Sequence, residues 1–492
     1  MGIEIEDKFD VPPEYAIPDL SGLADVVGPK SYQLVALYYD TPDLRLAARG
    51  VTLRRRRGGS DAGWHLKLPK AKGVRQEITC PLTRSTKVVP PELAELVRAY
   101  ARGAELKVVA ELETRRNVTV LQHGESRLVE VADDRVKGTV YGDDVRIVRW
   151  REVEAELLEG GDETLLAKVG KRLRKAGATP SEAASKLAKL LEPAPIPKAS
   201  MDPGSAGETV IDYLASQVAA LLSQDPRVRR AEEDAVHQMR VASRRLRSAL
   251  KAFKSAVIDT GQLQEELQWL GSVLGEARDL EVIRARFGRE LAGLAPELVT
   301  GPIQARLGSD LHKREQEAYE RIKDALSGDR YYTLLNALDE LVATPNLGKA
   351  AAKPAQERLS AIAAANWDRV TKAYDTAQAI DDPERREIAM HDVRKAAKRA
   401  RYTAEALQPT LGTNMRKLAK LAEGIQEILG AHQDGVVAQE TLAKEAESAR
   451  EAGEDTFTYG LLIGIERNAA ERAHAEFPRV WAETVKAVRK VL

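Results

Sequence analysis

The chain opens with Glu4-Ile5-Glu6-Asp7-Lys8, and this stretch decides how the first part of the sequence is interpreted. Successive side chains of a β-strand point to opposite faces, so Glu4, Glu6 and Lys8 share one face. Two carboxylates and an ammonium group then line about 13 Å of one wall. Such a set suits a hard cation such as Mg²⁺, which takes carboxylate ligands together with substrate phosphates. An exposed strand of mixed charge would show the same pattern, so later stretches must decide.

The stretches that follow have the residue types of short strands and carry mainly basic side chains. Turn residues such as Pro42 and the pair Gly58-Gly59 separate them. Within each strand, residues two apart face the same side, so at least one face of residues 51–57 is basic. The basic residues of these stretches include Arg54, Arg56, Lys67, Arg75, Arg115 and Arg116.

Acidic side chains return in the last two predicted strands. Glu130 and Asp134 lie on one side of residues 127–134, and Glu152 and Glu154 alternate with apolar residues, as in the opening strand. Charges on inward faces cost several kcal/mol each, unless they are paired or bind a charged ligand. A closed antiparallel sheet of about eight strands with a wet interior avoids that cost. Its natural ligand is a polyanion with metal counter-ions.

These motifs, in this order, resemble the CYTH domain of the triphosphate tunnel metalloenzymes over about residues 2–192. The resemblance rests on the opening Glu-x-Glu-x-Lys and on five later matches: Tyr39-Asp40-Thr41, Leu53-Arg54-Arg55-Arg56, Lys67, Arg75-Gln76-Glu77 and Glu152-Val153-Glu154. It implies an eight-stranded antiparallel tunnel, with flanking helices, that binds triphosphate and uses Mg²⁺ or Mn²⁺.

The resemblance also implies roles for individual residues. The implied metal ligands are Glu4, Glu6, Asp134, Glu152 and Glu154, and Glu4, Glu6 and Lys8 are the implied catalytic residues. The implied phosphate-binding residues are Lys8, Arg54, Arg56, Lys67, Arg75, Arg115, Arg116 and Lys186. Arg115 and Arg116 compete for one position, and Leu187 stands where the family often has an aromatic residue after Ser-Lys.

A segment rich in Pro, Gly and Ser, residues 193–207, separates this part from a helical second half. There His237, Arg240, Arg244, Arg247 and Lys251 recur at spacings of 3, 4, 3 and 4 residues. This spacing predicts one basic stripe along a helix. Like charges at these spacings repel each other, so an anion along the stripe would stabilise it. A solvated face, or a face paired with acidic neighbours, is the alternative.

The basic stripe occurs twice. A second copy begins at His391, 154 residues after His237, and the Leu-Gly motifs at Gly275 and Gly430 are 155 residues apart. Near-equal offsets in two separate motifs predict an internal duplication. Two equivalent helix bundles would bring both stripes to one concave surface.

These motifs resemble the CHAD domain, the conserved-histidine α-helical domain, over about residues 208–492. The resemblance implies two four-helix bundles related by a pseudo-twofold axis, with basic helices that bind inorganic polyphosphate. The predicted contacts are His237, Arg240, Arg244, Arg245, Arg247, Lys251, His391, Arg394, Lys395, Lys398, Arg399 and Arg401. We expect His237 and His391 to face phosphate rather than metal, since no dense cluster of His, Asp and Cys accompanies them in the sequence.

Composition sets the remaining expectations. The 492 residues have a formal net charge of zero, so an anionic partner must be recognised by local clusters. A lone cysteine, Cys80, excludes an intrachain disulfide framework and fits a reducing cytoplasm. No apolar run approaches the length of a membrane span, and few aromatic residues accompany the stripes, which disfavours nucleic-acid bases as ligands.

The sequence therefore predicts three parts: a tunnel domain (1–192), a linker (193–207) and a duplicated helical domain (208–492). The predicted function is metal-dependent hydrolysis of inorganic tripolyphosphate, joined to polyphosphate binding, in the cytoplasm or at polyphosphate granules. The same tunnel could serve an adenylate cyclase or a thiamine triphosphatase. A scaffold or granule protein whose tunnel only binds is the non-enzymatic alternative.

Overall fold

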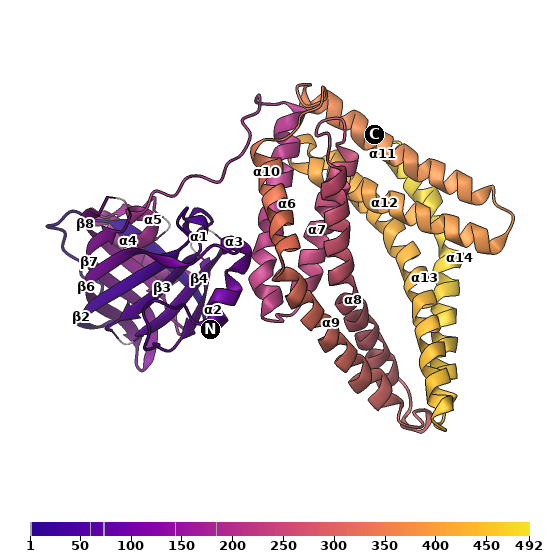
Figure 1. The fold of residues 1–492 in the computed structure, drawn as a ribbon, viewed down its shortest axis with the longest axis horizontal. Coiled ribbons are helices and arrows are strands. Elements are labelled where there is room, and N and C mark those ends of the chain that lie inside the picture. The colour runs from indigo at the N-terminus through magenta and orange to yellow at the C-terminus, as the bar shows by residue number, and fades with distance from the viewer. Residues whose placement is uncertain (1, 60, 72–73, 143, 184) are drawn as a thin grey trace. The chain divides into compact units, whose positions relative to one another are not determined.

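The computed structural model describes residues 2–59, 61–71, 74–142, 144–183 and 185–492, and for residues 2–4 it describes the backbone alone. The chain divides after Ile196 into two compact units, and each is described by itself (Figure 1).

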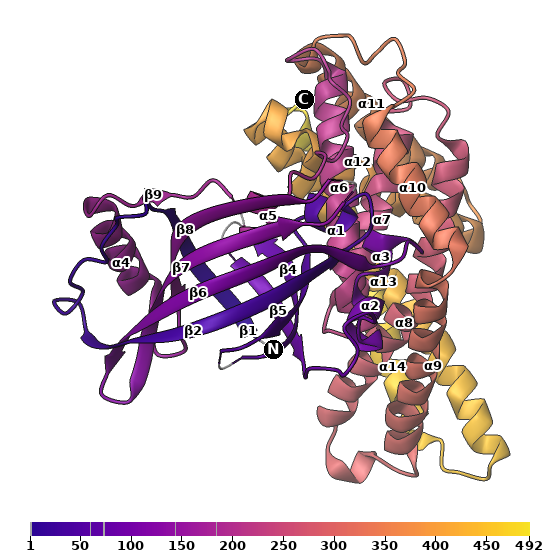
Figure 2. The same cartoon turned by 60° about the vertical axis from the view of Figure 1, so that its left-hand side comes forward.

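The first unit is a closed barrel of eight antiparallel strands (Figures 1 and 2). The strands are β1 (Gly2–Asp10), β2 (Asp25–Asp40), β3 (Thr52–Arg57), β4 (Gly63–Ala71), β5 (Val74–Cys80), β6 (Lys107–His123), β7 (Ser126–Val140) and β8 (Arg146–Leu157). Their order is β5-β4-β3-β2-β6-β7-β8-β1, and pairing of β5 with β1 closes the barrel. The predicted eight-stranded antiparallel tunnel with flanking helices is confirmed.

The apolar core of this unit lies outside the barrel, between the strands and short helices. Helix α4 (Glu163–Lys175) packs Val169 and Leu173 against Phe9 and Val153. Another apolar cluster includes residues of α1 (Arg45–Ala48), α2 (Pro91–Leu96) and α3 (Arg98–Ala101). Because apolar side chains take the outward positions of the strands, the alternate charged positions face the interior.

Two helices, not one interrupted helix, follow the last long strand. The sequence predicts a helix over residues 163–191 broken at 177–180, but helical structure resumes only at α5 (Lys186–Leu190). Between them β9 (Thr179–Pro180) pairs with the end of β1. Ser185 caps α5 by accepting a hydrogen bond from the Ala188 N–H, which fixes the position of Lys186 at the start of the helix.

The second unit is helical. It contains α6 (Ala206–Arg229), α7 (Ala235–Ala252), α8 (Gly261–Ala292), α9 (Leu311–Leu326), α10 (Asp329–Ala343), α11 (Ala355–Gln378), α12 (Pro383–Leu411), α13 (Thr413–Glu451) and α14 (Phe457–Val488). Consecutive helices pack from α6 to α9 and again from α11 to α14, and α7 also contacts α12 (Figure 2). Across the described residues, no helix has both the length and the apolar character needed to cross a membrane.

An arginine and two glutamates, of which only Glu466 is fully buried, join α8 to α14. Arg286 donates hydrogen bonds to Glu466, which is fully buried. The Nε atom of Arg286 also lies 3.5 Å from Glu290. Burial, followed by the hydrogen bond with Glu466, raises the pKa of Glu290 to about 8. The folded chain therefore keeps a proton that the unfolded chain releases near pH 4.5.

This group predicts a pH-dependent stability. Between about pH 4.5 and 8 the folded state binds more protons than the unfolded state, so the free energy of unfolding falls as pH rises. We expect Glu290→Gln to remove this contribution, because glutamine is neutral throughout. Thermal unfolding of the full chain at pH 5.5 and 8 measures it. If the melting temperature falls equally from pH 5.5 to pH 8 in wild type and in Glu290→Gln, the prediction is contradicted.

Candidate active site and anion-binding surface

The barrel encloses a charged cavity of about 580 Å³. The register of the strands explains why charged residues from different strands meet there. Asp134 on β7 faces Arg116 on β6 and Glu152 on β8, and Glu154 on β8 faces Lys8 on β1. Because residues two positions apart on a strand face the same side, the residues two positions before and after these also face this wall.

Three carboxylates form an acidic cluster at this wall. Asp134, Glu152 and Glu154 are all buried, and one oxygen atom from each lies within 4.8 Å of the others. Carboxylate oxygens are the ligands that hard divalent cations prefer. The cluster therefore fits a metal ion of the Mg²⁺ class.

Cations surround the acidic cluster. Lys186 Nζ lies 2.9 Å from Asp134, 2.7 Å from Glu152 and 2.6 Å from Glu154. Arg116 donates hydrogen bonds of 2.6 and 2.8 Å to Asp134 and one of 2.7 Å to Glu154. Burial alone would raise the pKa of Glu154, but Lys186, Lys8 and Arg116 hold that pKa well below its usual range. Glu154 therefore stays ionised although it is buried.

A second group of cations, contributed by strands earlier in the chain, also lines the cavity. Arg54 and Arg56 come from β3, Lys67 from β4 and Arg75 from β5. Burial and then the neighbouring Arg54 and Arg116 lower the pKa of Arg56. Its Nε is buried and has no hydrogen-bond partner in the described part of the chain. An anion in the cavity would satisfy such a group.

Glu77 and His65 organise these cations, and the sequence did not assign them to the site. Glu77 accepts a hydrogen bond of 2.9 Å from His65 Nδ1 and lies 3.7 Å from Lys67 and 3.9 Å from Arg54. Burial would raise the pKa of Glu77, but His65, Lys67 and Arg54 lower it to about 2. The two-residue spacing of His65 from Lys67, and of Glu77 from Arg75, was the available signal.

Most of the predicted tunnel residues meet in the cavity. Glu6 lines it and accepts a hydrogen bond of 2.8 Å from Lys8, which also contacts Glu154. Arg116 points inward, whereas Arg115 is exposed and does not join the site, because adjacent residues of a strand face opposite sides. The side chain of Glu4 lies outside the described residues, so its predicted role stays a prediction.

In the helical unit, both basic stripes line one cavity of about 900 Å³. Arg240, Arg244 and Arg247 of α7 lie on one side and His391, Lys395 and Lys398 of α12 on the other. Burial, followed by Arg394 and Arg244, lowers the pKa of Lys398 to about 8. The Nε atoms of Arg244 and Arg394 are buried without a hydrogen-bond partner among the residues described. The cations of this basic surface are therefore incompletely compensated.

The repeated Leu-Gly motif supports the first arginine of each stripe. Arg240 pairs with Asp279 at 2.8 Å, and at the equivalent place Arg394 lies 3.7 Å from Asp434. A Cβ on Gly275 would lie 3.5 Å from Arg240 Nη2, and one on Gly430 would lie 3.1 Å from Arg394 Nη2. A larger residue at the second glycine would displace the arginine.

Other predicted contacts of the stripes do not line this cavity. Arg245 and Arg401 both bind Glu405 and lie over the ring of Tyr402. The rest of this set is half-buried on the same two helices: His237, Lys251, Arg394 and Arg399. The structure therefore separates a cavity-facing set of cations from other cations of the same two helices that do not line the cavity.

Comparison with known proteins assigns both units. The family model of the CYTH domain matches residues 2–191, and that of the CHAD domain matches residues 212–443. The chain belongs to the CYTH–CHAD family. An uncharacterized protein of Mycobacterium tuberculosis is 39% identical over 99% of this chain and 97% of its own length.

Solved structures are similar to parts of the chain. PptA from Streptomyces chartreusis is 23% identical, with a TM-score of 0.46 over 56% of this chain and 99% of its own. The CHAD domain from the plant Ricinus communis is 25% identical, with a TM-score of 0.43 over 60% and 93% of the two chains. CYTH enzymes transfer or hydrolyse phosphate groups with the help of a metal ion, and the acidic cluster Asp134, Glu152 and Glu154 has the composition for that ion.

Proposed function

We propose that the CYTH domain hydrolyses inorganic tripolyphosphate with Mg²⁺ or Mn²⁺, and that the CHAD domain binds longer polyphosphate in the reducing cytoplasm. The observation that carries this proposal is a cavity lined by arginine and lysine side chains and by Glu154, which belongs to a cluster of three buried carboxylates. A triphosphate needs both: oxygen ligands for its metal ion and cations for its remaining charge.

The residues of the chain have distinct tasks in this reaction. Arg54, Arg56, Lys67 and Arg75 bind the phosphate oxygens and fix the chain in line with its attacking water. Lys8 is held between Glu6 and Glu154, so its ammonium group can donate to a phosphate oxygen without moving far. The metal ion, when bound at Asp134, Glu152 and Glu154, would neutralise phosphate charge and lower the pKa of a bound water.

Phosphate release tests the proposal directly. Purified full-length protein is given tripolyphosphate, ATP or thiamine triphosphate, each with Mg²⁺, with Mn²⁺ and with a chelator. We expect metal-dependent release that is fastest from tripolyphosphate. Faster release from thiamine triphosphate would identify that compound as the substrate instead. Formation of cyclic AMP from ATP would identify the barrel as an adenylate cyclase. No turnover of any of them would leave a protein whose tunnel only binds.

Polyphosphate binding by the CHAD domain should depend on pH through Lys398. Because its pKa is about 8, Lys398 loses its charge as pH rises through 8, and we expect affinity for polyphosphate to fall between pH 7 and 9. Lys398→Arg keeps the charge over that range and should flatten the dependence. Calorimetric titration with long-chain polyphosphate at both pH values measures it; an equal decline in wild type and variant would contradict the role.

A further inference from the structure

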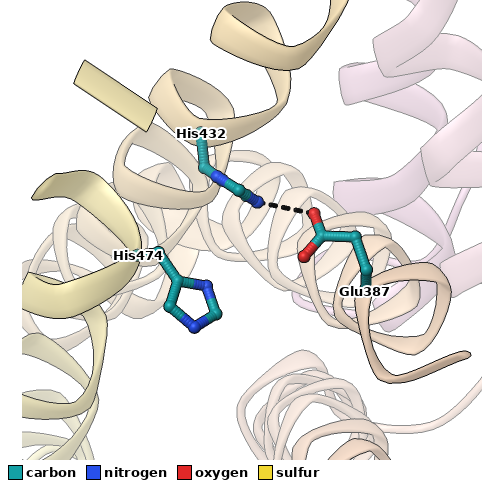
Figure 3. Close-up of side chains that lie close together, drawn as sticks. All are labelled: Glu387, His432 and His474. Carbon is teal, nitrogen blue, oxygen red and sulfur yellow. Dashed lines mark hydrogen bonds and ion pairs between the residues drawn. The ribbon is translucent and has the colours of Figure 1, made fainter. Parts of the chain in front are cut away.

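A second group of residues that could hold a metal ion lies in the CHAD domain, on three different helices. Glu387 belongs to α12, His432 to α13 and His474 to α14, and Figure 3 shows their side chains converging. The ligand-capable atoms of the three residues lie within 4.8 Å of one another. Neither the predicted tunnel residues nor the predicted polyphosphate contacts include them.

The contacts of His432 require a proton or a metal ion between its ring and Glu387. Its Nδ1 lies 3.3 Å from the carbonyl oxygen of Ala470, which can only accept, so this nitrogen carries the proton. In the neutral ring, Nε2 then presents a lone pair to Glu387 Oε1 at 2.6 Å. Two lone pairs face each other only with a proton or a metal ion between them. Metal-binding histidines commonly have this arrangement, with the second nitrogen donating to a backbone carbonyl.

His474 supplies a third ligand to the same place. The rings of His432 and His474 are 5.5 Å apart and inclined at 56°, so they are not stacked face to face. Ala470, which orients His432, lies one turn before His474 on α14. Ligand atoms on a tetrahedral ion are about 3.3 Å apart, given metal–ligand bonds of about 2.0–2.1 Å. Because His474 is exposed, rotation of its side chain can close the remaining distance.

The ligand types select the class of metal. Two imidazoles and one carboxylate suit borderline ions such as Zn²⁺ or Co²⁺, whereas the all-carboxylate cluster of the barrel suits Mg²⁺ or Mn²⁺. At the repeat offset of 155 residues, His432 and His474 correspond to Ala277 and Tyr319, which cannot form the same site. We propose that Glu387, His432 and His474 bind one divalent transition-metal ion, such as Zn²⁺, that links α12, α13 and α14.

Zn²⁺ titration of the full-length, chelator-treated protein tests the site. The titration is made in excess Mg²⁺, which occupies the carboxylates of the barrel. We expect one Zn²⁺ per chain, and about 100-fold weaker binding in His474→Ala, since loss of an outer-shell partner alone costs 10–100-fold. Because His474 is exposed, this substitution leaves the fold intact. His312→Ala removes an exposed histidine of α9 and is the matched control, with unchanged affinity.

Two further measurements separate a metal site from a protonated His432. Co²⁺ should give the intense visible absorption of a tetrahedral nitrogen and oxygen site in wild type and in His312→Ala, but not in Glu387→Gln. Zn²⁺ should raise the melting temperature of wild type and not that of His474→Ala. Equal Zn²⁺ affinity in wild type and His474→Ala, or no Co²⁺ absorption, would overturn the proposal and leave an imidazolium paired with Glu387.

Discussion

Replacement of Glu154 by glutamine is expected to lower kcat for tripolyphosphate about 10²–10³-fold, the size of effect seen when one pre-organised charged or polar group is removed from an active site. Glutamine has the shape of glutamate but is a poor metal ligand, and Glu154 is one of only three carboxylates in the buried cluster described. KM should not rise, because Lys8, Arg116 and Lys186 keep their charges and lose one carboxylate partner. Steady-state phosphate release with varied Mg²⁺ measures both constants.

The matched control is Glu113→Gln on the exposed face of β6, where Glu113 pairs with Lys137 at 2.6 Å. We expect this variant to keep wild-type kcat and KM. Polyphosphate binding by the CHAD domain should be unchanged in both variants. Full turnover by Glu154→Gln would remove the acidic cluster from the mechanism.

Reversal of three charges on the basic surface should impair polyphosphate binding and leave hydrolysis in the barrel intact. The triple variant Arg240→Glu, Arg244→Glu and Lys398→Glu is expected to weaken long-chain polyphosphate binding at least about 10³-fold, while tripolyphosphate hydrolysis continues. Each lost phosphate contact should also reduce the slope of log affinity against log salt by about one, as for nucleic-acid backbones. Titrations at several salt concentrations measure both quantities.

A control triple variant separates this site from general electrostatics. Lys323→Glu, Arg450→Glu and Arg479→Glu change the net charge by the same amount on other helices, where Lys323 is half-buried and the two arginines are exposed. Their effect should be small and should disappear at high salt. If both triple variants weaken binding equally, the basic surface between α7 and α12 is not the binding site.

The sequence predicted the barrel and much of its cavity because strand geometry obeys a simple rule. Charged residues two apart face one wall, which placed Arg54 with Arg56 and Glu152 with Glu154. The same rule could not choose between Arg115 and Arg116, which are adjacent. The choice depends on the pairing of Arg116 with Asp134 on the neighbouring strand β7, a contact between residues that are distant in the sequence.

Other parts of the two sites lay beyond sequence reasoning. Glu77 is visible in the sequence only as part of the Arg75-Gln76-Glu77 match, and its role depends on β4, which places His65 and Lys67 beside it. The cluster of Glu387, His432 and His474 shows no motif spacing, because its members are more than 40 residues apart and meet only when three helices pack. The duplicated stripes were visible because both copies keep the same helical period.

Placing both copies of the CHAD repeat in a single chain has a consequence for how its basic surface assembles. One copy supplies α7 and the other α12, so two separate single-copy proteins would have to dimerise to form the same surface. Covalent linkage makes that encounter intramolecular, with an effective concentration independent of how much protein the cell contains. It also allows the two copies to differ in sequence, so that equivalent positions, such as Ala277 in one copy and His432 in the other, can have different functions.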